Sequence, residues 1–190
     1  MASKKFNKRT VFYRRKRQQK TNYKKRLNLL KSGITRLVVR VHNNMIVAQL
    51  VDYDVKGDKV LVTVNSTDLK KMGWNYATAN LPACYLTGML LAKKANEKKI
   101  NPEKVILDLG IKNYAIKTRP YAVVKGALDN GIKVIVGEDA FPAQERIEGK
   151  HIADFATKSK EINKFQFNKT KDIEKITDAF NKLSGELKNG

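Results

Sequence analysis

The chain has 190 residues, 42% of them hydrophobic, and its 39 Lys+Arg against 18 Asp+Glu give a formal net charge of +21. The apolar share is enough for a core and excludes wholesale disorder, while one cysteine and two histidines exclude an intramolecular disulfide and a Cys/His zinc site. The longest mainly apolar stretch, residues 81–92, is too short to span a bilayer, and no secretory pattern follows the basic start. We therefore expect a soluble intracellular protein. Its net positive charge indicates that it binds a polyanion.

The positive charge is concentrated near the N-terminus. Residues 1–51 contain 15 basic residues and no acidic one, whereas the rest has 24 basic and 18 acidic residues. Eight of the thirteen residues 14–26 are basic, as in a solvated tail, a localisation signal or a nucleic-acid-binding segment. Membrane binding would require large apolar residues opposite the charges, and these are scarce before Leu27. Aromatic and amide side chains among the cations favour nucleic acid, because rings stack on unpaired bases while cations hold phosphates.

The first elements expected along the chain are an arm and a helix. Residues 1–13 lack periodicity and are expected to form a flexible arm. A helix is expected to begin with Thr21 as N-cap and to end at Ser32-Gly33, where glycine allows the left-handed stop. Its early turns are cationic and its last turn is apolar, so it should dock on the body at one end.

Three strands should follow, over residues 35–41, 45–53 and 59–65. The turns between them are short, so the strands are expected to be antiparallel neighbours. In the first strand the residues alternate, which places Arg36 and Arg40 together on the face opposite the apolar positions.

The pattern then changes to alternating helices and strands. A helical turn is expected over 67–72, followed by a polar loop and a long helix capped by Asn80. After it we expect a strand over 104–109, a helix that begins at Pro120 and a strand over 132–136. This order predicts an α/β fold with a mixed five-stranded sheet (strand-strand-strand-helix-strand-helix-strand) between helical layers.

The remaining residues differ in character from the core. Residues 141–155 are polar and are expected to be loop-rich, and residues 162–171 are rich in lysine. Apolar residues then recur every three or four positions over 173–187, which predicts an amphipathic terminal helix. Its apolar stripe is expected to pack on its own body, with a partner protein as the alternative. We expect three parts: a basic RNA-binding arm and helix (1–33), an α/β core (34–140) and a C-terminal extension (141–190).

Catalytic and cofactor-binding motifs are missing from the sequence. It has no Gly-rich phosphate loop, and Cys84 lies among apolar residues, where a thiol is inert. The main enzymatic alternative is a metal-dependent nuclease of ribonuclease-H-like architecture, for which Asp108 is suggestively placed. However, neither the first strand nor the long helix supplies a second carboxylate, so we expect no enzyme, no metal and no cofactor.

Several blocks of the sequence resemble large-subunit ribosomal protein eighteen of the archaeal and eukaryotic type. They span most of residues 14–155 in the family's order. The blocks are Lys-Thr-Asn-Tyr-Lys-Lys-Arg-Leu at 20–27, Ser-Gly at 32–33, Arg-Leu-Val-Val-Arg at 36–40, Gly-Trp at 73–74, the stretch 80–88 beginning Asn-x-Pro-Ala, Lys-Gly-Ala-Leu-Asp at 125–129 and the stretch 145–153 beginning Glu-Arg-Ile.

The resemblance implies a structural component of the large ribosomal subunit, acting in translation in the cytoplasm. Such a protein binds 5S ribosomal RNA, attaches it in the central protuberance, and contacts the large-subunit ribosomal RNA and neighbouring large-subunit ribosomal proteins; no membrane is implied. A third possibility is a protein-interaction module whose charge serves only nuclear import. The candidate RNA-binding residues are Arg14, Arg15, Lys16, Arg17, Lys20, Thr21, Asn22, Tyr23, Lys24, Lys25, Arg26, Arg36, Arg40, Asn43, Asn44, Lys71, Trp74, Asn80 and Arg119.

Overall fold

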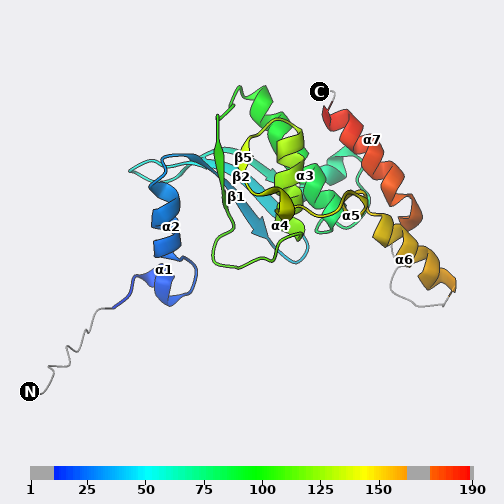
Figure 1. The fold of residues 1–190 in the computed structure, drawn as a ribbon, viewed down its shortest axis with the longest axis horizontal. Coiled ribbons are helices and arrows are strands. Elements are labelled where there is room, and N and C mark those ends of the chain that lie inside the picture. Colours follow the sequence, from blue (N-terminus) through cyan, green and yellow to red (C-terminus); the bar gives the residue numbers. More distant parts are fainter. Residues whose placement is uncertain (1–10, 162–171, 189–190) are drawn as a thin grey trace, which may run out of the picture.

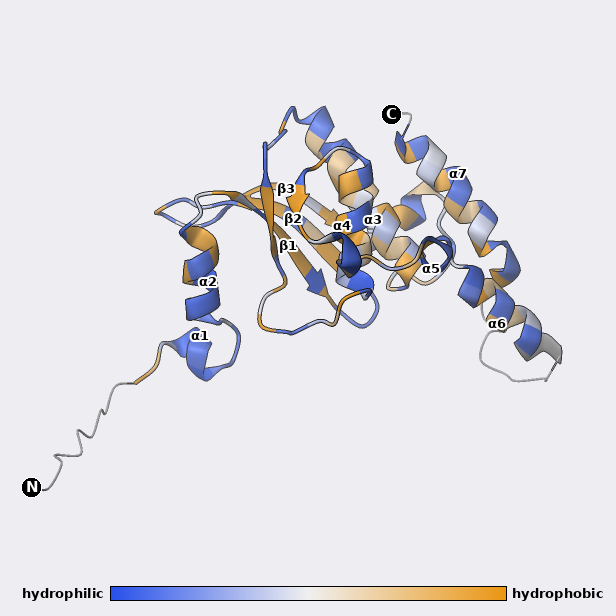
Figure 2. Cartoon of the chain, viewed as in Figure 1, coloured by the Kyte–Doolittle hydropathy of each residue, from blue (hydrophilic) through white to orange (hydrophobic). Residues whose placement is uncertain are grey.

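The structure is a computed structural model that describes residues 11–161 and 172–188. It begins with two short helices, α1 (Arg14–Arg17) and α2 (Tyr23–Leu30). Residues 1–10, which make up most of the predicted arm, and the whole lysine-rich segment 162–171 lie outside the described part. Figure 2 shows that α1 and the early turns of α2 are hydrophilic and that the last turn of α2 is hydrophobic.

Helix α2 begins one residue later than expected. Asn22 is its cap, because the side-chain oxygen accepts a hydrogen bond from the Lys25 N–H at 3.1 Å. Thr21, the predicted cap, instead accepts a hydrogen bond from Arg15 Nε at 2.8 Å, which links α1 to the start of α2. Gly33 follows α2 with a φ of +64°, as predicted for the stop.

The five strands form a single mixed sheet, as predicted. Its order is β3-β2-β1-β4-β5, with the first three strands antiparallel and β4 and β5 parallel to β1. The parallel pairing of β1 with β4 brings the loop after β4 beside the end of β1. The strands are β1 (Thr35–Val41), β2 (Ile46–Asp52), β3 (Lys59–Asn65), β4 (Val105–Asp108) and β5 (Val134–Ile135).

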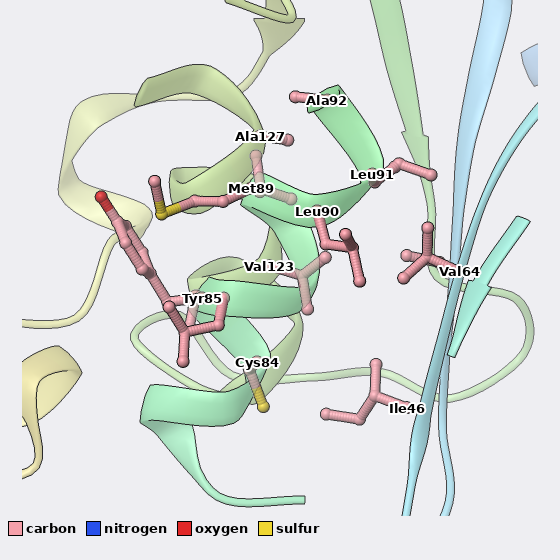
Figure 3. Close-up of a cluster of buried hydrophobic side chains, with 14 of the residues drawn as sticks. Ile46, Val64, Cys84, Tyr85, Met89, Leu90, Leu91, Ala92, Val123 and Ala127 are labelled. Atoms are coloured by element: carbon pink, nitrogen blue, oxygen red, sulfur yellow. The ribbon is translucent and has the colours of Figure 1, made fainter. Parts of the chain in front are cut away.

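Two helices, α3 (Leu81–Glu97) and α4 (Arg119–Asp129), cover one face of this sheet. Asn80 caps α3 as predicted, since its side-chain oxygen accepts a hydrogen bond from the Ala83 N–H at 2.9 Å. In Figure 3, Leu90 and Leu91 lie on the side of α3 that faces the strands, whereas the ring of Tyr85 points away from them. Helix α3 is buried along most of its girth, which its nearly continuous apolar sequence requires.

Helices α3 and α4 approach each other at two glycines. A Cβ atom at Gly88 would lie 2.0 Å from the Val123 carbonyl oxygen, and one at Gly126 would lie 2.1 Å from the Tyr85 carbonyl oxygen. Only residues without a side chain permit this backbone contact.

The C-terminal part is more helical than expected. Residues 141–155 were predicted to be loop-rich, which is wrong, because α5 (Gln144–Glu148) and the first half of α6 (Lys150–Glu161) fall there. The two helices join at Gly149, whose φ is +87°, so the chain turns between them and the apolar pattern loses its period. Ile147, 1% exposed, anchors α5 in the core.

Helix α7 (Ile176–Lys188) packs against α3, as the apolar stripe predicted. Its four apolar stripe residues are buried, and the ring centroids of Phe180 and Tyr85 lie 5.5 Å apart. A short 3₁₀ turn, η4 (Ile173–Lys175), precedes it. The core is therefore continuous from the strands through α3 to the last helix.

The helical layers on the two sides of the sheet are unequal. Figure 1 shows α1 and α2 on the side of the sheet opposite α3 and α4. All eight residues of α2 are described, and none of them is buried. On this side, therefore, the cationic pair α1–α2 does not pack closely on the sheet.

Candidate nucleic-acid interface

A cleft of about 710 Å³ separates the α1–α2 pair from the ends of β1 and β4. We call it the cationic cleft. Asp108 is the single carboxylate among its lining residues. The cations that line it come from α1, the following turn, α2, β1 and the loop after β4; they are Arg15, Lys20, Lys25, Arg26, Arg40 and Lys112. Elements that are distant in the sequence thus place their basic side chains around the same cleft.

A chain of ion pairs joins α2 to the sheet across this cleft. Arg26 Nη2 lies 2.7 Å from Asp58 Oδ1, in the turn between β2 and β3. Asp58 in turn lies 2.9 Å from Arg36 Nη2, and Asp108 lies 3.5 Å from Arg36 and 3.3 Å from Arg40. Three cations therefore share two carboxylates, and the network keeps a net positive charge.

Asp58 is the central anion of this network. The hydrogen bond from Arg26 lowers the pKa of Asp58 against the opposing effect of burial, and the two arginines add a favourable charge interaction. The same hydrogen bond raises the pKa of Arg26. Arg36 Nη2 forms an ion pair with Asp58 Oδ1 at 2.9 Å, which also lowers the pKa of Asp58.

The fold buries Arg36, which was expected to face RNA. Its side chain is 2% exposed and lies between two carboxylates. Arg40, on the same strand face, is 38% exposed, and its Nη1 donates to the Asp108 backbone carbonyl at 2.7 Å. Alternation placed the two arginines correctly on one face, but only Arg40 reaches the cleft.

Trp74, another candidate RNA-binding residue, is enclosed by the protein. Its side chain is fully buried, and its Nε1–H donates to the Ala77 carbonyl at 3.1 Å. The ring forms an edge-to-face contact with Tyr76, with centroids 5.1 Å apart. Trp74 therefore supports the loop over residues 73–80 from inside.

A second group of candidate residues surrounds this loop and lies outside the cationic cleft. The Thr78 hydroxyl donates to the Asn44 carbonyl at 2.6 Å, and Arg119 Nη1 donates to the Ala79 carbonyl at 3.3 Å. Lys71, two residues before the loop, and Asn43, the neighbour of Asn44, are exposed. Asn80 has its side-chain oxygen engaged as the cap of α3. The candidates thus include one group in the cleft and one around the loop. Five others lie on or beside these helices but do not line the cleft: Arg14, Lys16, Arg17, Tyr23 and Lys24.

Two residues important to the cleft were missed from the sequence. Lys112 lines it because β4 pairs parallel with β1, and the basic loop after β4 was the available signal. Asp58 had no local signal, since its partners are 22 and 32 residues away in sequence.

Chemistry other than binding finds little support among the described residues. No three His, Cys, Asp or Glu residues of residues 11–161 and 172–188 converge on a possible metal site. The Asp108 carboxylate is occupied by Arg36, Arg40 and the Gly110 N–H, the last at 2.8 Å. Burial raises the pKa of the Cys84 thiol, which keeps it protonated. Within the part that the structure describes, every helix is too short or too polar to cross a membrane.

Comparison with known proteins identifies the family. Residues 7–101 match the family described as ribosomal large subunit proteins 60S L5, and 50S L18. The large ribosomal subunit protein uL18 of the archaeon Methanoregula boonei is 40% identical over 172 residues, which cover 90% of this chain and 94% of the relative. Basic charge, the mixed sheet and the cationic cleft agree with this match. The chain therefore belongs to the L5/L18 family of large-subunit ribosomal proteins, structural and non-enzymatic components of the cytoplasmic ribosome whose partners are ribosomal RNA and other ribosomal proteins.

Proposed function

We propose that this protein binds 5S ribosomal RNA and attaches it to the large subunit in the central protuberance. The observation that carries the proposal is the cationic cleft, where six cations surround a single carboxylate that is already paired. The resemblance of residues 20–27 and 36–40 to the 5S-binding family supports the choice of RNA.

In this proposal α1, α2 and Arg40 neutralise RNA phosphates, and the loop over residues 73–80 offers a second contact. Arg36 and Trp74 act from inside the protein by holding these surfaces in place. Phosphate contacts of this kind fix position and orientation on the RNA, while discrimination between RNAs comes from shape and unpaired bases.

Filter binding of the purified protein to 5S RNA, with transfer RNA as competitor, tests the proposal. With about six to eight phosphates neutralised, log K should fall with log[salt] at a slope of roughly −4 to −7. Replacing Arg15, Lys20 and Lys25 together with glutamine should reduce that slope by about 2 to 3.

The matched control replaces three exposed lysines of α6 and α7, namely Lys158, Lys182 and Lys188, with glutamine. It removes the same charge away from the cleft and should leave the slope nearly unchanged. Equal affinity for 5S RNA and transfer RNA would refute the choice of RNA, and equal slopes for both triple variants would refute the choice of surface. For attachment, large subunits from cells depleted of this protein should lack 5S RNA in sucrose gradients.

A further inference from the structure

Two exposed tyrosine rings meet where α1 and α2 begin. The ring centroids of Tyr13 and Tyr23 are 5.4 Å apart at an angle of 58°. Despite this contact, Tyr13 is 75% exposed and Tyr23 is 38% exposed. Each ring therefore covers part of the other and leaves aromatic surface open to solvent.

The backbone fixes the position of this ring pair. The Tyr13 carbonyl accepts hydrogen bonds from the N–H groups of Lys16 and Arg17, at 2.9 and 3.0 Å, and so starts α1. Tyr23 is the first residue of α2, directly after its cap. The hydrogen bond between Arg15 and Thr21 ties the two helix starts together. The pair is thus held at a defined place on the surface.

The surroundings of the rings combine apolar surface with positive charge. Phe12 is 58% exposed, and Lys16 Nζ lies 3.8 Å from the centroid of its ring. All four residues of α1 are basic and exposed. In Figure 2 the segment that enters α1 is hydrophobic, next to a hydrophilic α1. We call Phe12, Tyr13 and Tyr23 the aromatic platform.

We propose that the aromatic platform binds an unpaired RNA base, which stacks on the exposed ring surface while the cations of α1 hold the flanking phosphates. An unpaired nucleotide fits because it presents a π face and a negative charge together. A base inside a duplex does not fit, because its faces are covered by neighbouring pairs. An apolar protein surface would leave the four cations of α1 without partners. The inference rests on the proposed function, since it assumes that this surface meets RNA.

The test compares two RNA hairpins, one fully paired and one with a single bulged 2-aminopurine. The protein should quench the fluorescence of the bulged base and bind the bulged hairpin more tightly. The double variant Tyr13→Leu/Tyr23→Leu keeps apolar side chains but loses both rings, and it should bind the bulged hairpin about 5- to 150-fold more weakly. Tyr13→Phe/Tyr23→Phe keeps both rings and should bind as the parent does.

Salt dependence separates stacking from charge. The leucine variant should keep the parent's slope of log K against log[salt], because stacking releases no counterions. Arg17→Gln, which leaves the Arg15–Thr21 hydrogen bond intact, should reduce the slope by about 0.7 to 0.9. Circular dichroism and the melting temperature check that the leucine variant folds. If it is destabilised, the preference of the parent for the bulged hairpin still decides the question.

Three results would overturn the inference. The first is equal binding of both hairpins by the parent protein. The second is a leucine variant that still prefers the bulged hairpin. The third is a leucine variant that binds RNA normally but is lost from large subunits, which would indicate a protein partner. Failure to bind 5S RNA would refute the proposed function separately, because the hairpin preference does not depend on that RNA.

Discussion

Replacing Asp58 with asparagine removes one negative charge beside the cationic cleft and leaves the side chain nearly the same size. The net charge rises from +21 to +22, so charge counting alone predicts tighter RNA binding. The geometry predicts the opposite. Helix α2 has no buried residue among its eight described ones, and the 2.7 Å pair between Arg26 and Asp58 ties it to the β2–β3 turn. Without the carboxylate, α2 loses its fixed position over the cleft.

The magnitude follows from the exposure of the two partners. A hydrogen bond to a charged group contributes about 1.5–3 kcal/mol when well shielded. The Arg26 and Asp58 side chains are 35% and 27% exposed, so solvent screening reduces the expected loss to about 1 kcal/mol. The fraction of molecules with α2 in place, and with it the RNA affinity, should therefore fall by up to about fivefold. Amide hydrogen exchange over residues 23–30 should become faster.

Asp54→Asn is the matched control, because Asp54 lies in the same turn and its side chain bonds only locally, to the Lys56 N–H at 3.2 Å. It makes the same change in charge without touching α2 and should strengthen RNA binding slightly. In a double-mutant cycle, Asp58→Asn should have little further effect on hydrogen exchange in α2 once Arg26→Gln has removed the contact, because the other partner of Asp58, Arg36, lies in β1. If Asp58→Asn tightens RNA binding as much as Asp54→Asn and leaves exchange in α2 unchanged, the reasoning is refuted.

Three further predictions concern stability, measured by urea unfolding. Arg36→Gln should lower the free energy of unfolding by about 2–3 kcal/mol, because it breaks a buried ion pair, although Asp108 still pairs with Arg40. Arg40→Gln should lower it by about 1 kcal/mol or less. Equal losses in the two variants would contradict the buried, structural role of Arg36. Gly88→Ala should cost about 3 kcal/mol or more, because backbone atoms must move apart, whereas Gly185→Ala in α7 meets nothing within 4 Å and should be stabilising by about 0.5–1 kcal/mol. Because the pKa of Asp58 is lowered in the folded state, its contribution to the free energy of unfolding is present above about pH 4 and is lost as the pH falls through the lowered pKa. Asp58→Asn should therefore make the free energy of unfolding depend less on pH in the acid range. An unchanged pH dependence would show that the Arg26–Asp58 pair contributes nothing to stability.

The sequence was sufficient for elements whose stabilising contacts are local or periodic. Alternation located β1, a cap with Pro82 located the start of α3, and an apolar stripe located α7. It was insufficient where the stabilising partner is distant. The burial of Arg36 depends on Asp58 and Asp108, which folding brings from 22 and 72 residues away.

The same reason explains the errors at Trp74 and after Phe141. Trp74 lies in a polar loop, so its sequence neighbours indicate exposure, yet the loop folds over the ring and supplies the Ala77 carbonyl to its N–H. Gly149 interrupts the helical period between α5 and α6, so no window of the sequence shows either helix clearly. The cleft itself was predictable only in its α1–α2 half, because its other wall depends on the pairing of β1 with β4.

The packing of α7 on α3 has a consequence for the order in which the chain can fold during its synthesis. Phe180, Leu183 and Leu187 cover the side of α3 that faces away from the sheet, and they follow every other described element in the chain. A nascent chain that has completed its sheet therefore still exposes the apolar surface around Tyr85, the kind of surface through which folding intermediates aggregate. The basic N-terminal helices emerge much earlier. They are made while that surface is still open, so a ribosome engaged in making this protein presents a strongly basic segment long before the core can close.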